Sequence, residues 1–152
     1  MRKGLILFAL ALAITGCAQQ QKTETTTPAP STAQAPAVKI EDRDWDLVMV
    51  GEMQNPQGNG GRPATLRLDT EAQRAVGNAG CNRYSGTYRL SGDSLSFGPA
   101  ISTKMACEQG MDLETAWLGA LAKIVTFSAT ESTLTLNGAD GPVARLAEHR
   151  AP

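Results

Sequence analysis

The sequence predicts an α+β domain in which a mainly antiparallel, curved sheet of about seven or eight short strands packs against one helix. Short runs of alternating apolar and polar residues recur through the C-terminal two thirds of the chain, separated by turns rich in Gly, Asn and Asp. One segment instead carries apolar residues at helical spacing. Several strands followed by a single helix and further strands favour an α+β domain over an alternating α/β arrangement.

The expected strands are short, and each has one apolar face. In the first, residues 45–49, the side chains of Trp45, Leu47 and Met49 share a face. A hairpin is expected about Ser91-Gly92-Asp93, a sequence typical of a short turn. The remaining strands are predicted at 65–69, 74–77, 87–90, 94–97, 124–127, 133–136 and 143–146.

The predicted helix follows residue 111. Its apolar stripe recurs every three or four residues and consists of Leu113, Ala116, Trp117, Ala120, Leu121 and Ile124. Asp112 is predicted to cap its N-terminus, and Glu114 suits the positive end of the helix dipole. Gly119 is costly inside a helix, so we expect it at a close contact with a strand.

The N-terminus resembles a bacterial lipoprotein signal peptide. Arg2 and Lys3 precede the apolar run Leu5–Ala13, which is too short to span a bilayer, and Ile14-Thr15-Gly16-Cys17 resembles a lipobox. We therefore expect residues 1–16 to be removed and Cys17 to carry the lipid that anchors the chain to a membrane. Because Ala18 rather than Asp follows that cysteine, we expect the outer membrane, with the domain facing the periplasm.

Composition divides the remainder into a disordered tether, residues 17–41, and a folded domain, residues 42–149.

Loss of Arg2 and Lys3 with the signal leaves a mature formal net charge of −3, which argues against a nucleic-acid partner. The scattered basic residues are interpreted as solvated positions on strands and loops, not as one patch; they are Arg62, Arg67, Arg83 and Arg89.

Two cysteines, Cys81 and Cys107, remain after lipidation. In an exported protein they most simply form a disulfide. Two free buried thiols are the main alternative. A zinc site or a cysteine nucleophile would each depend on His149, the single histidine of the chain. We expect no metal and no cofactor.

No residue pattern predicts catalysis. A G-x-S-x-G elbow is missing from the sequence, and a histidine base is available only near the C-terminus. Carboxylates such as Glu108, Asp112 and Glu114 could pair for acid–base chemistry, although the last two suit a helix start. We therefore expect no catalytic residues.

The segment from Gly77 to Tyr88 is the densest in special residues, because its glycines and asparagines favour positive φ angles or a backbone crossing. It resembles the G-C-N-x-[YF]-x-G-x-Y motif of META domains, the family that includes HslJ-like envelope lipoproteins, and 102–107 resembles the T-[RK]-M-A-C element. The matching residues are Gly80, Cys81, Asn82, Tyr84, Gly86, Tyr88, Thr103, Met105 and Cys107.

The resemblance, which extends over about residues 44–146, implies an exported domain of strands with one helix, paired motif cysteines and no enzymatic activity. The expected function is non-catalytic: binding of an unknown envelope protein or small ligand, or a role in envelope stress and maintenance. Two alternatives stay open. One is a carboxylate-based hydrolase or transferase, and the other is an inhibitor or partner-docking module with an exposed apolar patch near Tyr84 and Tyr88.

Overall fold

The structure is a computed structural model that describes residues 38–150. The predicted signal peptide, Cys17 and the tether as far as residue 37 lie outside the described residues. Residues 38–41, assigned above to the tether, include part of the core: Ile40 is 1% exposed, and its carbonyl accepts a 3.0 Å hydrogen bond from Trp45 Nε1. Within residues 38–150, no helix combines the length and hydropathy needed to cross a membrane.

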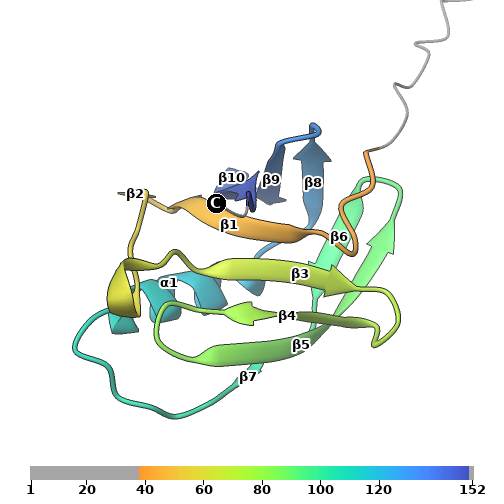
Figure 1. Cartoon of the computed structure of the whole chain (residues 1–152). Helices are drawn as coiled ribbons and strands as arrows, with labels where there is room; N and C mark the ends of the chain where they lie inside the picture. The colour runs from red at the N-terminus through yellow and green to blue at the C-terminus, as the bar shows by residue number, and fades with distance from the viewer. Residues whose placement is uncertain (1–37, 151–152) are drawn as a thin grey trace, which may run out of the picture. The chain divides into compact units, whose positions relative to one another are not determined.

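Ten strands, one α-helix and one short 3₁₀ helix make up the described part of the chain (Figure 1). The strands before the helix are β1 (Asp44–Val50), β2 (Met53–Gln54), β3 (Thr65–Asp69), β4 (Arg74–Asn78), β5 (Arg83–Ser91), β6 (Ser94–Phe97) and β7 (Ile101–Ser102). The 3₁₀ helix η1 (Asn59–Gly61) lies between β2 and β3, and α1 (Met111–Leu121) follows β7. The chain ends with β8 (Thr126–Ala129), β9 (Thr133–Gly138) and β10 (Gly141–Glu148).

Eight of the strands close into an antiparallel barrel in the order β1-β3-β4-β5-β6-β8-β9-β10. Pairing between β1 and β10 closes the ring, with Trp45 opposite Glu148 and Val50 opposite Ala144. β2 pairs with β1 and β7 pairs with β5, both outside the ring. The prediction of an α+β fold, a curved sheet of about seven or eight strands packed against one helix, is therefore wrong, because the domain is a closed, mostly β barrel with one short helix.

Closure depends on features that local alternation does not encode. The first and last barrel strands lie about a hundred residues apart in sequence, and each would present an unpaired edge if the sheet stayed open. Both strands also contain a register shift, between Leu47 and Met49 in β1 and between Pro142 and Ala144 in β10. Such bulges bend a strand and increase its twist, which helps the two edges meet.

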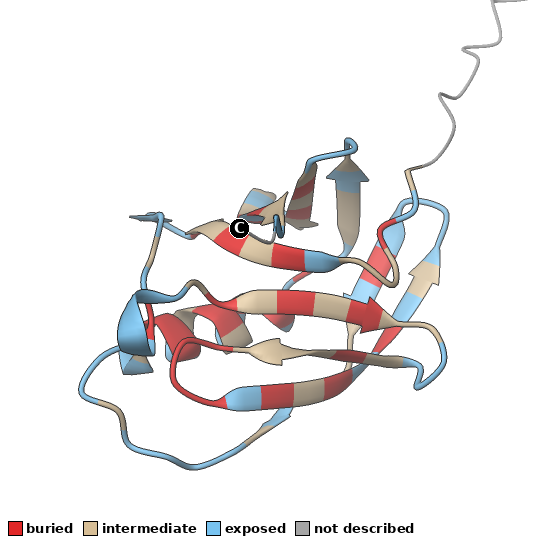
Figure 2. Ribbon diagram, in the orientation of Figure 1, coloured by how far each residue is buried: buried red, intermediate tan, exposed pale blue. Residues whose placement is uncertain are grey.

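Alternating burial marks the inner and outer faces of the barrel strands (Figure 2). In β3, Leu66 and Leu68 are buried, whereas Thr65 and Arg67 are only partly covered. The same period of two runs along β5, where Tyr84 and the alternate residues after it point inward. One continuous core results, with Trp45 of β1 and Trp117 of α1 both fully buried in it.

The helix lies at the end of the barrel where β4 leads into β5 (Figure 1). Leu113, Trp117 and Leu121 enter the core, which confirms the predicted stripe. The capping prediction is wrong, because the N-cap is Gly110, with φ 90°, and it makes no side-chain capping bond. The expectation for Gly119 is also wrong: a Cβ there would have no atom within 4 Å.

Candidate functional site

Three glycine backbones cross beside the start of α1, and they join segments that are distant in the sequence. Gly80, between β4 and β5, has φ +122°, and a Cβ on it would lie 2.7 Å from the carbonyl oxygen of Gly110. A Cβ on Gly58 would lie 2.3 Å from the carbonyl oxygen of Gly80. That same oxygen accepts a 2.7 Å hydrogen bond from the backbone N–H of Asn59. Gly58 is therefore part of a packed crossing and not of a free loop tip.

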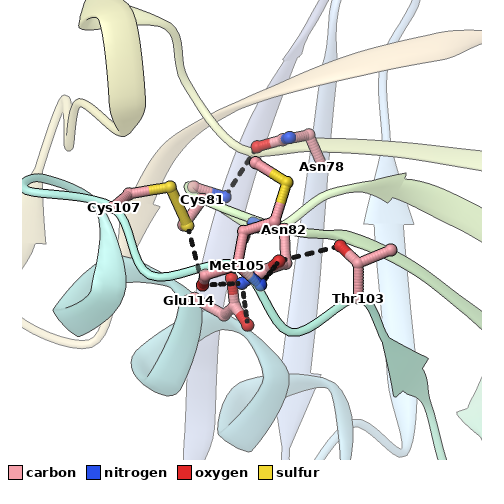
Figure 3. Close-up of a disulfide and its surroundings, with 8 residues drawn as sticks. Asn78, Cys81, Asn82, Thr103, Met105, Cys107 and Glu114 are labelled. Atoms are coloured by element: carbon pink, nitrogen blue, oxygen red, sulfur yellow. Dashed lines mark hydrogen bonds between the residues drawn. A yellow bond between two sulfur atoms is a disulfide. The ribbon is translucent and has the colours of Figure 1, made fainter.

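Asn82 is the centre of a buried hydrogen-bond network beside this crossing (Figure 3). Its Oδ1 accepts from Thr103 Oγ1 and from the backbone N–H of Met105, both at 2.8 Å. Its Nδ2 donates to the Met105 carbonyl at 3.0 Å and to Glu114 Oε1 at 3.2 Å. The side chain, whose residue is 2% exposed, thus bonds through both its donor and its acceptor group.

Glu114 brings the helix into the same network. Its Oε2 accepts a 2.7 Å hydrogen bond from the backbone N–H of Asn82, and Glu114 is 8% exposed. Burial of a carboxyl group is costly unless its oxygens are hydrogen-bonded, and here Asn82 supplies both donors, one from its backbone N–H and one from its side chain. The motif asparagine therefore attaches α1 and the segment 103–105 to the start of β5.

Cys81 and Cys107 lie at disulfide distance next to this network, with Cα atoms 5.9 Å apart (Figure 3). The bond joins the residue after Gly80 to the segment that precedes α1. In the chain-entropy model, closing a loop of this length stabilises the folded state by about 3.5 kcal/mol. The cysteines, the glycines and Asn82 consequently hold together one junction of the fold.

We expect Cys81 and Cys107 to be oxidised in protein isolated from the periplasm. Alkylation of the denatured, unreduced chain carrying Cys17→Ser should label no cysteine, and prior reduction should allow two to be labelled. Mass spectrometry counts the labels. Two labels without reduction would contradict the bond.

The motif tyrosines are interior residues whose hydroxyl groups are both hydrogen-bonded. Tyr84 is packed edge-on against Trp117, with ring centroids 6.4 Å apart, and its hydroxyl donates to the Thr65 carbonyl at 3.0 Å. Tyr88 donates to Glu41 Oε1 at 2.6 Å. Burial raises the pKa of both tyrosines, and the bond to the Glu41 carboxylate raises the pKa of Tyr88 further. Both are therefore packing residues with satisfied polar ends.

Gly86, which is also in the motif, is buried on the same strand as these tyrosines. A Cβ there would lie 3.4 Å from backbone atoms of residues 98–100, the segment that links β6 to β7. Glycine thus allows this link to pass close to β5.

A groove of about 1020 Å³, partly open to solvent, runs along β3, β4, β5 and β7. Its walls continue into the segment before α1 and into η1. Three arginines line it, namely Arg62, Arg67 and Arg83, together with Asp44, whose carboxylate lies 3.3 Å from Arg67 Nη1. Ile101 and Met105, 70% and 60% exposed, lie along the same groove.

The three carboxylates considered for acid–base chemistry do not lie together in one site. Glu114 is hydrogen-bonded to Asn82, whereas Glu108 and Asp112 are exposed and line a second hollow beside Met53 and Met111.

Among residues 38–150, no three His, Cys, Asp or Glu side chains come together as a metal site. His149 instead contacts Asp46 Oδ2 through Nδ1 at 2.8 Å, and this carboxylate raises the pKa of the imidazole.

Two features of the site are missing from the sequence-based interpretation. The bond between Asn82 and Glu114 spans 32 residues and has no local signal. The grouping of arginines was only partly detectable: Arg67 lies in the expected strand 65–69, but Arg83 precedes the expected strand 87–90, and the adjacency of the two strands had to be known. Interpreting these arginines as unrelated surface residues missed the groove.

The sequence model of the META domain family matches residues 38–151, which is most of the chain. The residues that form the junction, from Gly80 to Glu114, all lie inside the match. Among curated proteins, none shows significant similarity to this chain.

Two solved structures are similar in fold. A protein from Burkholderia xenovorans, solved by NMR, is 27% identical with a TM-score of 0.60, and the alignment covers 81% of this chain and 100% of that protein. A second NMR structure is 21% identical with a TM-score of 0.55, covering 71% of this chain and 90% of the other. At 21% identity, the second likeness concerns the fold alone.

Proposed function

Because this chain belongs to the META domain family, a membership that supports a bacterial envelope-associated domain, we propose that it is a lipid-anchored envelope protein that binds a ligand without catalysis. The anchor rests on Ile14-Thr15-Gly16-Cys17 behind a short apolar run. Ala18 supports the outer membrane as the site of anchoring, with the domain in the periplasm. The binding role rests on the groove described above.

The way polar groups are used in the domain favours binding over catalysis. The buried polar residues are the motif residue Asn82 and its partner Glu114, and their side chains hydrogen-bond to each other and to neighbouring backbone. The groove, by contrast, offers side chains that are open to solvent, among them Arg62, Arg83 and Ile101. A carboxylate-based hydrolase would need an open acid–base pair, and Glu114 is held away from that role by its two bonds to Asn82.

Docking of a protein partner is a second candidate function. Tyr84 and Tyr88, the residues expected to mark an apolar patch, are buried. Ile101 and Met105 are exposed beside Tyr84 in the same groove and would be the apolar contacts for such a partner.

Replacing Cys17 with Ser is expected to abolish membrane anchoring, because the thiol is the group that accepts the lipid. The native chain should partition into the detergent phase of a cell extract, and the variant should move to the aqueous phase and lack the mass of the acyl chains. Separation of the two membranes by density then tests the outer-membrane assignment of the native chain.

A matched control is Cys81→Ser, which replaces one cysteine of the disulfide in the folded domain and should leave the lipid in place. Detergent partitioning of Cys17→Ser equal to that of the native chain, with no difference in lipid mass, would refute the anchor.

A further inference from the structure

The groove over β3, β4 and β5 is lined by more basic than acidic side chains. Arg67 projects from β3, Arg83 from the start of β5 and Arg62 from the link between η1 and β3. Asp44 is the single carboxylate among the residues that line the groove, and it pairs with Arg67. The lining is therefore net positive, although the mature chain is expected to carry a formal charge of −3.

The remaining two guanidinium groups are available to a ligand. Arg62 and Arg83 are exposed, and neither makes an ion pair or a side-chain hydrogen bond to any other residue in the described range 38–150. Asn78 also lines the groove. Its Oδ1 accepts a hydrogen bond from the backbone N–H of Gly80, and its Nδ2 group is the donor that a ligand could use. A groove with spare donors and one neutralised carboxylate favours an anion, and guanidinium groups suit phosphate or carboxylate oxygens.

An apolar wall accompanies these donors. Ile101, at 70% exposure, lies opposite Ser85 in the β5–β7 pairing, so it lies next to the outer face of β5. Met105, at 60% exposure, has its backbone fixed on both sides by Asn82. These two large side chains are held at the surface by pairing and by buried hydrogen bonds, not by chain flexibility. A free inorganic anion would leave them without a contact.

From this juxtaposition we propose that the groove binds the phosphate-bearing head group of an anionic lipid at Arg62 and Arg83, with the adjoining aliphatic chain against Ile101 and Met105. The inference deepens the proposed binding function and rests on it. Charge complementarity selects the anionic head, and the exposed aliphatic side chains select a ligand with a hydrocarbon portion. The proposed anchor would keep the groove within reach of a lipid surface.

Three probes separate the two halves of the ligand: dodecyl phosphate below its micellar concentration, inorganic phosphate for the head alone, and dodecyl maltoside for the chain alone. The protein is the mature chain, residues 17–152, carrying Cys17→Ser. Binding is followed by NMR shifts and calorimetry at pH 7.5. Dodecyl phosphate should bind at least tenfold more tightly than either other probe, and its affinity should fall as salt rises.

Variants locate the binding. Arg62→Gln with Arg83→Gln should weaken dodecyl phosphate binding at least tenfold. Arg89→Gln, which removes an exposed arginine of β5 outside the groove, should change it less than twofold. Ile101→Ser should weaken dodecyl phosphate binding and leave the response to inorganic phosphate unchanged. Thermal melts of each variant verify that the fold is retained.

Several results would overturn the proposal. Equal affinity for inorganic and dodecyl phosphate would indicate a free-anion site, and equal affinity for dodecyl maltoside would indicate an apolar surface without charge recognition. Unchanged binding in the Arg62→Gln, Arg83→Gln double variant, or an equal loss in Arg89→Gln, would place the contact elsewhere. None of these results alters the detergent partitioning of the native chain, so failure of the lipid site and failure of the anchor are distinguishable.

Discussion

Replacing Asn82 with Ala should lower the free energy of unfolding by about 3–5 kcal/mol, the range for breaking a buried network that includes a charge. The substitution removes the donor to Glu114 Oε1 and leaves the Met105 backbone and Thr103 Oγ1 without their partner. Unfolding in urea, with the disulfide intact, measures the loss. Thr103→Ala is the matched control. It removes one hydrogen bond of the network, from Thr103 Oγ1 to Asn82 Oδ1, and should cost only about 1 kcal/mol.

A double-mutant cycle with Glu114→Ala separates the pair from its surroundings. Because the Nδ2 of Asn82 bonds to Glu114 Oε1, the two substitutions should be clearly non-additive, with a coupling of about 1–3 kcal/mol. A loss below 1 kcal/mol in Asn82→Ala, or strict additivity in the cycle, would contradict the role assigned to this network.

Gly80→Ala should cost about 4 kcal/mol, of which roughly 2 kcal/mol comes from backbone strain and roughly 2 kcal/mol from overpacking. At φ +122° an L side chain is strained, and the new Cβ would lie 2.7 Å from the Gly110 carbonyl oxygen and 3.1 Å from Leu113 Cγ. Relief of this clash would move the start of α1 away from β5. Thermal and urea unfolding measure the cost, and amide exchange near residues 110–114 should report the loosened helix start.

Gly119→Ala is the control for this substitution. Gly119 is exposed in α1 and would place its Cβ in open space, so the change should stabilise the domain by about 0.5–1 kcal/mol through helix propensity. Similar effects of the two substitutions would show that the close crossing at Gly80 is not what requires glycine there.

These contacts indicate what the motif does in this chain. Gly80 permits the backbone crossing, Cys81 reaches Cys107, and Asn82 holds both the segment before α1 and Glu114. Each motif residue at this point joins segments that the chain separates by twenty or more residues. Gly80, Cys81 and Asn82 are therefore explained by the stability of one junction, and the groove beside it is the surface available for a ligand.

The sequence by itself determined the positions of most strands, the helix and the hairpin about Gly92. Alternation in β3 and β5 specifies which side chains face inward, since the side-chain period of a strand is a local property of the backbone. The stripe of α1 predicts its buried face in the same way. The motif residues Gly80, Cys81 and Asn82 were likewise detectable without coordinates, because unusual residue types cluster there.

Only the tertiary structure decided that the sheet closes, that Glu114 is the partner of Asn82, and that Arg62, Arg67 and Arg83 share a groove. The periodicity of apolar residues predicts which face of a helix or strand is buried, but it does not predict which other element packs against that face. Strand order, barrel closure and contacts over 32 residues arise when many apolar side chains pack together at once. For residues on the outer face, the sequence pattern predicts least, because almost any polar side chain is tolerated in contact with solvent. Which of them come together depends on the order of the strands that carry them.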